Sequence, residues 1–286
     1  MSKNISKKQN SLKIPKIILI SAKIIEFFST KFGTLFAVKL FTTPIKHKMP
    51  NREHEMDKNS NQYLLNIPEI DKKIRIYEYG NGSRKALLVH GWSGRGTQLY
   101  KIADELIKND FKIISFDAPA HGKSESNHTI MVEFIASILE IQNKYENFEI
   151  AIGHSLGGMA LMNAMNNDLK TNKLVTIGAG NLVIDIFDDF INKLQMKPIQ
   201  ATLLKNYFEK KYNRTLDELS SVTNAKKIDI PTLIVHDEND DEVPADCAKE
   251  IIKVLKNGEL LITHKLGHRK ILGDAAVINK IIDFVD

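Results

Sequence analysis

Three residues whose types can together perform acyl transfer stand in the chain in the order Ser155, Asp240 and His268. A serine hydroxyl is a weak nucleophile at neutral pH and needs an adjacent base, a role that an imidazole can fill. The imidazole in turn needs a carboxylate that fixes its tautomer and stabilises its protonated form. These residues form a hydrolytic site only if the elements around them bring them together.

Ser155 lies in the segment Gly-His-Ser-Leu-Gly-Gly at 153–158, which has the pattern G-x-S-x-G. An apolar run precedes the segment and a helical pattern follows it, so the serine is expected on a sharp strand-to-helix turn with its hydroxyl exposed. Glycine is needed on either side because a side chain there would meet neighbouring backbone. The N-terminal end of the following helix favours developing negative charge. The alternative is a glycine-rich turn that serves packing alone.

The carboxylate is sought in the acidic loop that follows the apolar run 231–235. Asp240 fits best, because it stands five residues past the expected end of the strand, just before a Val-Pro pair that begins a helix. Asp241 is the second choice, and a solvated loop accounts for the remaining acids. The acids that compete for the role are Asp237, Glu238, Asp240 and Asp241.

The base is sought after the last apolar run, 259–263. Gly267 frees the backbone just before His268, so a loop there can turn the imidazole towards the serine. His264 is the second choice. The other histidines are expected to serve in loops and in packing, and these include His121, His128 and His154.

The oxyanion of a tetrahedral intermediate needs two backbone donors. The N–H of Leu156 directly after the serine is one, and Trp92, in the loop after the run 86–90, is placed to supply the other. The alternative for this loop is a plain turn at Gly91 and Gly94 on which the Trp92 ring packs. The spacing of its glycines matches neither common phosphate-binding pattern, which argues against a nucleotide site.

Apolar runs alternate with helical patterns from residue 62 onwards, which predicts an α/β fold with a mostly parallel central sheet flanked by helices. Ligands of such sheets bind beyond the carboxyl ends of the strands, where each candidate residue falls. The segment 181–230 has about fifty residues, more than a direct connection between two neighbouring strands needs. It contains helical patterns at 182–194 and 203–211. The expected strands are 73–79, 86–90, 112–116, 149–153, 173–177, 231–235 and 259–263, and the helices between them are 97–109, 130–145, 157–167 and 245–257.

With these motifs in place, residues 62–286 resemble the α/β-hydrolase superfamily. The matching segments are His-Gly-Trp at 90–92, Asp-Ala-Pro-Ala-His-Gly-Lys-Ser at 117–124, the G-x-S-x-G turn, Asp-x-x-Val-Pro at 240–244 and Gly-His at 267–268. The resemblance implies the α/β-hydrolase fold and a serine hydrolase with catalytic residues Ser155, Asp240 and His268 and an oxyanion hole at Trp92 and Leu156.

The chain is similar to bacterial esterase-like and lysophospholipase-like members of the superfamily. Members that open epoxides or remove halides have aspartate in place of Ser155, so those activities are not expected. The resemblance also implies a core formed by 62–180 and 231–286, with a helical cap or lid at 181–230. The lysine-rich N-terminal segment 1–61 is not part of the common fold.

Composition bounds the remaining possibilities. A chain of 286 residues with 43% hydrophobic content can bury one sizeable core. A single cysteine, Cys247, excludes an internal disulfide framework and a thiol-rich metal site. The chemistry proposed for Ser155 needs no metal and no organic cofactor. Residues 1–50 hold ten lysines and one acid, a charge of +9, and the rest sums to −4, so no nucleic-acid partner is expected.

The basic start of the chain has its own pattern. Residues 12–41 read as an amphipathic helix in which Lys16 and Lys23 fall opposite the apolar side, with Gly33 expected to end or bend it. Its uncharged runs, 17–22 and 32–38, are too short for a membrane span. Lys23 and Glu26 interrupt the apolar run that a cleaved signal peptide would need. Two interpretations remain, namely a helix packed on the body and a helix lying on an anionic membrane surface. A cytoplasmic protein, free or peripheral at the membrane, is therefore expected.

The sequence is compatible with three functions. The first is hydrolysis of a small-molecule carboxylic ester through an acyl-enzyme on Ser155. The second is a lysophospholipase or thioesterase activity on membrane-derived acyl chains. The third, from another class, is a binding module that keeps the fold without catalysis, for which a complete serine, acid and histidine set has no physical need.

Overall fold

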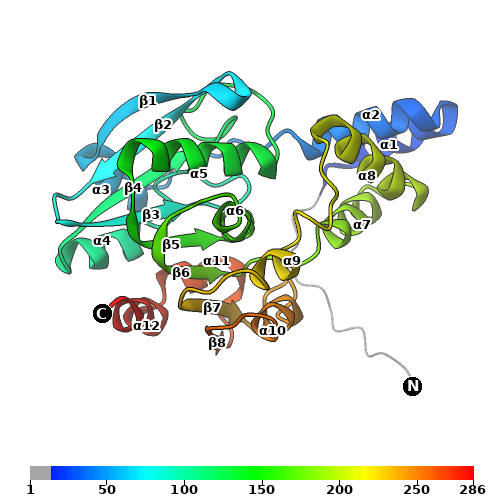
Figure 1. Cartoon of the computed structure of the whole chain (residues 1–286). Coiled ribbons are helices and arrows are strands. Elements are labelled where there is room, and N and C mark those ends of the chain that lie inside the picture. The colour runs from blue at the N-terminus through cyan, green and yellow to red at the C-terminus, as the bar shows by residue number, and fades with distance from the viewer. Residues whose placement is uncertain (1–13) are drawn as a thin grey trace.

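A single eight-stranded sheet runs through the body in the computed structural model, which describes residues 14–286 (Figure 1). The strand order is β1-β2-β4-β3-β5-β6-β7-β8. Pairing is antiparallel from β1 to β4 and parallel from β4 to β8. The strands are β1 Asn61–Ile67, β2 Lys72–Tyr79, β3 Arg84–Val89, β4 Phe111–Asp117, β5 Phe148–His154, β6 Thr171–Ile177, β7 Thr232–Asp237 and β8 Gly258–Thr263. The predicted mostly parallel sheet is confirmed.

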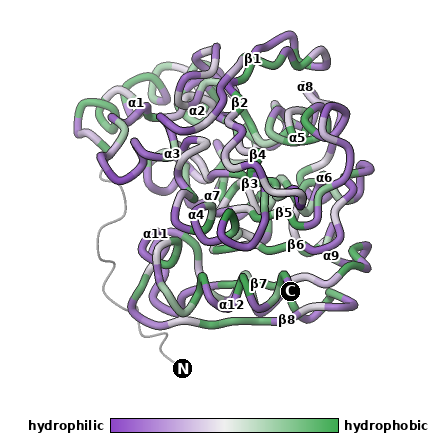
Figure 2. Tube along the Cα trace, turned by 90° about the vertical axis from the view of Figure 1, so that its left-hand side faces the viewer, coloured by the Kyte–Doolittle hydropathy of each residue, from purple (hydrophilic) through white to green (hydrophobic). Residues whose placement is uncertain are grey.

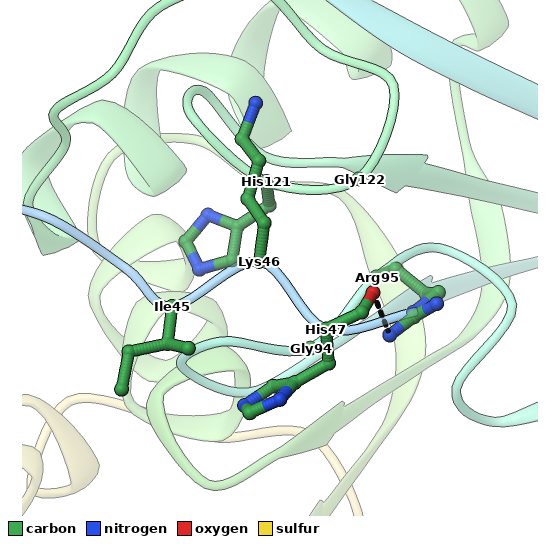
Figure 3. Close-up of a pocket in the computed structure, with 7 residues that line it drawn as sticks. All are labelled: Ile45, Lys46, His47, Gly94, Arg95, His121 and Gly122. Carbon is green, nitrogen blue, oxygen red and sulfur yellow. Dashed lines mark hydrogen bonds between the residues drawn. The ribbon is translucent and has the colours of Figure 1, made fainter. Parts of the chain in front are cut away.

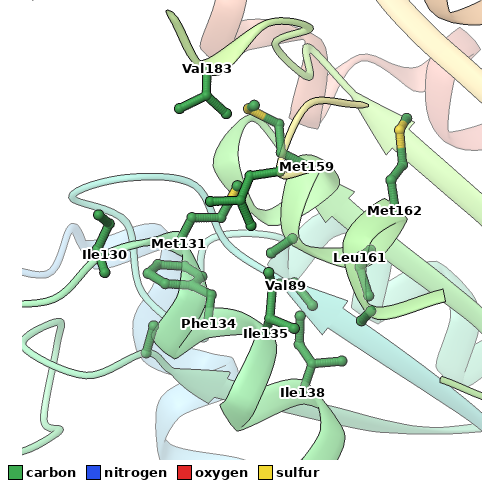
Figure 4. Close-up of a cluster of buried hydrophobic side chains, with 14 of the residues drawn as sticks. Val89, Ile130, Met131, Phe134, Ile135, Ile138, Met159, Leu161, Met162 and Val183 are labelled. Atoms are coloured by element: carbon green, nitrogen blue, oxygen red, sulfur yellow. The ribbon is translucent and has the colours of Figure 1, made fainter. Parts of the chain in front are cut away.

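Helices cover both faces of this sheet because the strands are apolar on both sides. Leu87 and Val89 belong to a core shared with α5 and α6, part of which Figure 4 shows. Leu88, between them, points to a second core shared with α4 and α12. The flanking helices are α3 His54–Asn59, α4 Tyr100–Lys108, α5 Met131–Tyr145, α6 Leu156–Met165, α10 Asp246–Ile252, α11 Gly267–Lys270 and α12 Ala275–Val285.

The segment between β6 and β7 is helical, as its patterns predicted. It contains α7 Val183–Lys193, α8 Ile199–Tyr212 and α9 Ser221–Ala225. Between α8 and α9, Thr215 caps a turn, since its hydroxyl accepts from Glu218 N at 3.2 Å while the Glu218 carboxylate accepts from Thr215 N at 2.6 Å. We call α7 and α8 the cap helices, because they leave the sheet at the carboxyl end of β6.

The N-terminal segment differs from its prediction. It forms two helices, α1 Lys16–Phe28 and α2 Thr30–Phe41, and the break falls at Ser29, whose hydroxyl accepts from Phe32 N at 3.3 Å. The expectation that Gly33 ends or bends the helix is wrong. Gly33 lies inside α2, where an added Cβ would stand 2.9 Å from Gln200 Nε2. The glycine therefore serves the close crossing of α2 and α8.

The two N-terminal helices pack on the cap helices, and Figure 1 shows the four side by side at one end of the molecule. Buried polar contacts join them. The Glu26 carboxylate accepts from Lys197 N at 3.0 Å, and the Thr34 hydroxyl donates to Gln200 Oε1 at 2.7 Å. Among residues 14–286, no helix has both the length and the hydropathy needed to cross a membrane.

Candidate active site

Ser155 occupies the turn between β5 and α6, with φ 52° and ψ −120°. This left-handed backbone costs a residue with a side chain roughly 1–3 kcal/mol, and its neighbours hold it in place. Ser155 N donates to Ile177 O at 2.8 Å. A Cβ added at Gly153 would lie 2.6 Å from the Gly157 carbonyl carbon, and one at Gly157 would lie 2.4 Å from Val89 O. The predicted strand-turn-helix geometry and its need for glycine are both present.

Asp240 and His268 form a buried pair. The His268 Nδ1–H donates to Asp240 Oδ2 at 2.6 Å, and each side chain is almost wholly enclosed. Burial raises the pKa of Asp240, but hydrogen bonds from His268 and from the backbone N–H groups of Val243 and Glu242 outweigh it, so the pKa lies below its ordinary value. An ionised Asp240 fixes His268 with Nδ1 protonated, which leaves the Nε2 lone pair available.

The second choices for acid and base lie elsewhere. Asp241, the second choice for the acid, is exposed. His264, the second choice for the base, pairs with the competing acid Glu238 at 2.7 Å on the surface, with both side chains mostly exposed. Strand β7 continues to Asp237, two residues beyond its expected end. Asp240 is therefore fewer residues away from the end of the strand than expected from the sequence.

The His268 ring lies against the turn that holds Ser155. Its centroid is 4.6 Å from that of His154, the residue before the serine. A Cβ added at Gly178, directly after β6, would stand 3.1 Å from His268 Nδ1. Within residues 14–286 the Ser155 hydroxyl forms no hydrogen bond, so the structure brings His268 beside the serine turn without joining the two side chains.

The loop after β3 also touches this turn, since a Cβ added at Gly91 would lie 3.0 Å from Ser155 Cβ. Neither Trp92 N–H nor Leu156 N–H donates to a protein acceptor in the described part of the chain. Both donors are therefore available for a bound oxyanion. The Trp92 ring stacks on Phe41, from the end of α2, with centroids 6.4 Å apart.

Two histidines hold this loop in a way that the sequence did not indicate. His121 Nε2 accepts from Ser93 N at 3.0 Å, while its Nδ1–H donates to Pro119 O. Burial lowers the pKa of His121 to about 4, which keeps the ring neutral at pH 7 and its Nε2 able to accept. His90 accepts from Ala118 N at 3.0 Å in the same manner. The loops after β3 and β4 are thereby fastened together.

Two buried aspartates brace the surrounding turns. The Asp237 carboxylate accepts from Gly267 N at 2.9 Å and from Leu266 N at 3.1 Å, and so fixes the backbone that leads into His268. The Asp117 carboxylate accepts from Gly96 N at 2.7 Å and from Lys123 N at 2.6 Å. In the sequence, Asp237 is one of four candidates for the catalytic acid, and Asp117 begins the segment 117–124 that resembles the α/β-hydrolase superfamily. Only the fold shows which backbone N–H groups these two carboxylates accept from.

A small pocket lies between the loop after β3 and the segment that follows α2 (Figure 3). Arg95 in its wall donates to His47 O at 3.0 Å and lies 3.6 Å from the Glu53 carboxylate. These contacts join the segment after α2 to the body, and the Arg95 guanidinium is already paired with protein groups. The described residues contain no cluster of three or more histidine, cysteine or acidic side chains suited to a metal ion. The pocket is lined by Ile45, Lys46, His47, Gly94, Arg95, His121 and Gly122.

Known proteins resemble this chain in both sequence and fold. Residues 87–197 match the alpha/beta hydrolase fold family, and residues 143–285 match the prolyl oligopeptidase family. A 2-hydroxy-6-oxononadienedioate/2-hydroxy-6-oxononatrienedioate hydrolase of Escherichia coli O81 (strain ED1a) is 25% identical over 271 residues, which covers 77% of this chain and 93% of the relative.

Solved structures give the same architecture. A putative lipase from Acinetobacter baumannii superposes with a TM-score of 0.63 at 18% identity, covering 84% of this chain and 97% of that one. A Pyrococcus furiosus esterase gives a TM-score of 0.63 at 15% identity, covering 85% of this chain and 98% of that one. The chain therefore belongs to the α/β-hydrolase superfamily, and it is a hydrolase of that fold.

Proposed function

We propose that this hydrolase cleaves carboxylic esters through an acyl-enzyme on Ser155. The observation that supports this most directly is the buried Asp240–His268 pair at 2.6 Å, set against the strained turn that holds the serine. A buried carboxylate–imidazole pair costs desolvation and has no evident structural need at this position. Such a pair beside a serine is the arrangement that activates a hydroxyl for acyl transfer.

The reaction begins when Ser155 Oγ attacks the ester carbonyl carbon while His268 Nε2 takes the hydroxyl proton. Asp240 stabilises the imidazolium that forms. The carbonyl electron pair moves to oxygen, and the N–H groups of Trp92 and Leu156 bind this oxyanion at the positive end of α6. When the tetrahedral intermediate collapses, the bond to the alcohol oxygen breaks and His268 protonates that oxygen.

The acyl-enzyme then reacts with water in the same way. His268 Nε2 removes a proton from the water, and the resulting oxygen nucleophile attacks the acyl carbon. The oxyanion again forms between the same two N–H groups. Collapse breaks the bond to Ser155 Oγ, which regains its proton from His268 and releases the carboxylic acid.

Aromatic side chains beside the oxyanion loop support an apolar acyl group. Phe41 stacks on Trp92 and also contacts Phe187 and Phe190 of α7, with centroid distances of 4.9 and 5.2 Å. Phe41 and Phe190 are partly exposed, whereas Phe187 is buried, so an acyl chain that extends towards the cap would lie against Phe41 and Phe190. The E. coli relative is named for substrates with two carboxylates, whereas Arg95, the cation of the loop after β3, is already paired with Glu53. Esters with apolar acyl groups are therefore favoured over such dioates.

The proposal is tested with p-nitrophenyl esters from acetate to palmitate. We expect turnover with the wild-type chain and a loss of at least about 10³-fold in kcat in Ser155→Ala. Ser83→Ala is the matched control, because Ser83 is exposed and its hydroxyl contacts only Asp110. The chain-length optimum then reports the size of the acyl site. Full activity in Ser155→Ala would overturn the assignment.

A further inference from the structure

The large apolar side chains of helix α1 face outward. Phe27 is 83% exposed, Phe28 80% and Ile17 73%, on a helix whose opposite side is buried against the cap. Figure 2 shows α1 at an outer corner of the molecule, with hydrophobic residues along it. We call the six exposed side chains of this surface the outer apolar face, and they are Ile17, Ile20, Ile24, Phe27, Phe28 and Phe32.

The outer apolar face is organised along the helix. Its five members on α1 fall at spacings of three, four and seven residues, which places them in one stripe. The buried residues of α1, Ala22 and Glu26, lie on the opposite side. Glu26 accepts from Lys197 N at 3.0 Å, so a polar contact holds the helix to the cap and the large apolar side chains are left in solvent. A clustered apolar surface of this kind marks an interaction site.

Lysines border the stripe. On the helix, Lys16 and Lys23 fall directly beside the stripe, so the expectation that they lie opposite the apolar side is wrong. Lys31 precedes Phe32 on α2. All three are exposed, and none pairs with a carboxylate among the residues described by the structure. Glu26 is the one acid in the first fifty residues of the sequence, and it is buried. The rim of the outer apolar face is therefore purely cationic.

We propose that the outer apolar face docks on an anionic membrane surface. Phenylalanine and isoleucine side chains that enter the headgroup region, flanked by lysines that meet anionic lipid, are the chemistry of a helix lying in the membrane plane. Both helices are too short to cross a bilayer. A second copy of the chain is a poorer occupant, because self-association would bring two lysine rims together.

Docking would also orient the cap. Helix α2 is joined to α8 by the Thr34–Gln200 hydrogen bond, and Phe41 at its end stacks on Trp92. We call α1 and α2 together the hairpin. A membrane-bound hairpin therefore holds the cap and the loop after β3 near the lipid. This consequence rests on the proposed function, and it makes membrane-derived acyl esters the substrates that reach the site most directly.

Vesicle co-sedimentation of the full chain tests the docking. Vesicles of phosphatidylglycerol and phosphatidylcholine in equal parts should bind it, and Phe27→Ser with Phe28→Ser should weaken binding by at least about tenfold. These two rings contact mainly each other, with centroids 5.4 Å apart, so the fold should survive their loss. Leu64→Ser is the matched control, because Leu64 is an exposed apolar residue on β1, outside the hairpin.

The charge requirement is tested separately. Lys16→Glu with Lys23→Glu should weaken binding by about tenfold or more, and added salt should do the same. Lys226→Glu with Lys227→Glu makes the same change in charge outside the hairpin and should leave binding near the wild-type value. Vesicles of phosphatidylcholine alone should bind much less protein.

Several results would overturn the docking. These are no binding to anionic vesicles, binding that the hairpin variants do not weaken, and equal binding to phosphatidylcholine alone. A lipid-free dimer that Phe27→Ser with Phe28→Ser dissociates would assign the face to a second copy. Turnover of a soluble p-nitrophenyl ester should be unchanged in every variant, and turnover of a vesicle-borne ester should fall with binding. Absence of soluble turnover in the wild-type chain would contradict the proposed function and leave the docking result intact.

Discussion

His154 donates from Nε2 to the backbone carbonyl of His268 at 2.9 Å, so the residue before the serine holds the backbone of the histidine that is proposed to activate it. Burial lowers the pKa of His154 to about 3, with the nearby His268 adding to the effect, which keeps the ring neutral. This contact couples the two loops that must meet in the proposed reaction. We regard His154 as a positioning residue.

Replacement of His154 tests this coupling. His154→Phe keeps a ring but removes the donor, and we expect kcat to fall about tenfold with KM little changed, because the imidazole of His268 loses its orientation. His154→Gln retains a side-chain donor and should recover part of the loss. Steady-state kinetics on a soluble ester measure both. Equal kcat in wild type and His154→Phe would show that the hydrogen bond does not position His268.

The same neutral histidines predict how stability depends on pH. The pKa of His154 is about 3 and that of His121 about 4, against 6.5 for both in an exposed chain. Between these values the folded state binds fewer protons than the unfolded chain, so stability is full above pH 6.5 and falls as the pH drops. At about pH 5, each of these two histidines should lower the free energy of unfolding by about 2 kcal/mol relative to neutral pH.

Urea unfolding at about pH 7.5 and about pH 5 measures this loss. His154→Gln and His121→Gln should each reduce the difference between the two pH values by about 2 kcal/mol. Both variants are compared with the wild type at each pH, so a uniform loss of stability does not affect the result. A difference that both substitutions leave unchanged would contradict neutral burial of these rings.

Asp240→Asn tests the choice of acid. The amide cannot stabilise the imidazolium and favours the wrong tautomer of His268, so kcat should fall by up to about 10⁴-fold with little change in the fold. Asp241→Asn is the matched control, because it removes a neighbouring exposed carboxylate. Kinetics and far-UV circular dichroism are compared for the two. A larger loss in Asp241→Asn would move the role to the next residue.

Asp237→Ala tests the support of the histidine loop. The carboxylate accepts from two backbone N–H groups before His268 and from the Thr263 hydroxyl at 2.7 Å, and alanine leaves these donors unsatisfied. We expect a loss of about 3 kcal/mol in unfolding free energy, together with a lower kcat. Denaturant unfolding measures the first quantity. A stability equal to that of the wild type would show that water replaces the carboxylate.

Much of this fold could be predicted from local pattern. The buried strands read as apolar runs because both of their faces are covered by helices. Strand β1 was missed because it lies at the edge of the sheet, where polar residues such as Asn61 and Asn66 are tolerated. The placing of Asp240 beside His268 was predictable from the loops that follow β7 and β8, which are neighbouring parallel strands.

Other features depend on contacts that sequence pattern does not contain. The helix breaks at Ser29 because the Ser29 side chain caps α2. Gly33, which the sequence pattern favoured as the end of the helix, lies instead where α2 crosses α8. The loop-fastening role of His121 depends on Ser93, which is far from it in the sequence. The outward direction of the apolar stripe on α1 is set by the buried contact of Glu26 with Lys197 N, since periodicity alone does not say which side of a helix is covered.

Labelling with an active-site fluorophosphonate tests the central claim most directly. The probe reacts with a serine only where a base and an oxyanion site activate it. We predict that mass spectrometry will find one phosphonyl group per chain, on the peptide that contains Ser155, and that His268→Ala will abolish the labelling. A well-folded chain that remains unlabelled, or that is labelled at another serine, would contradict the account.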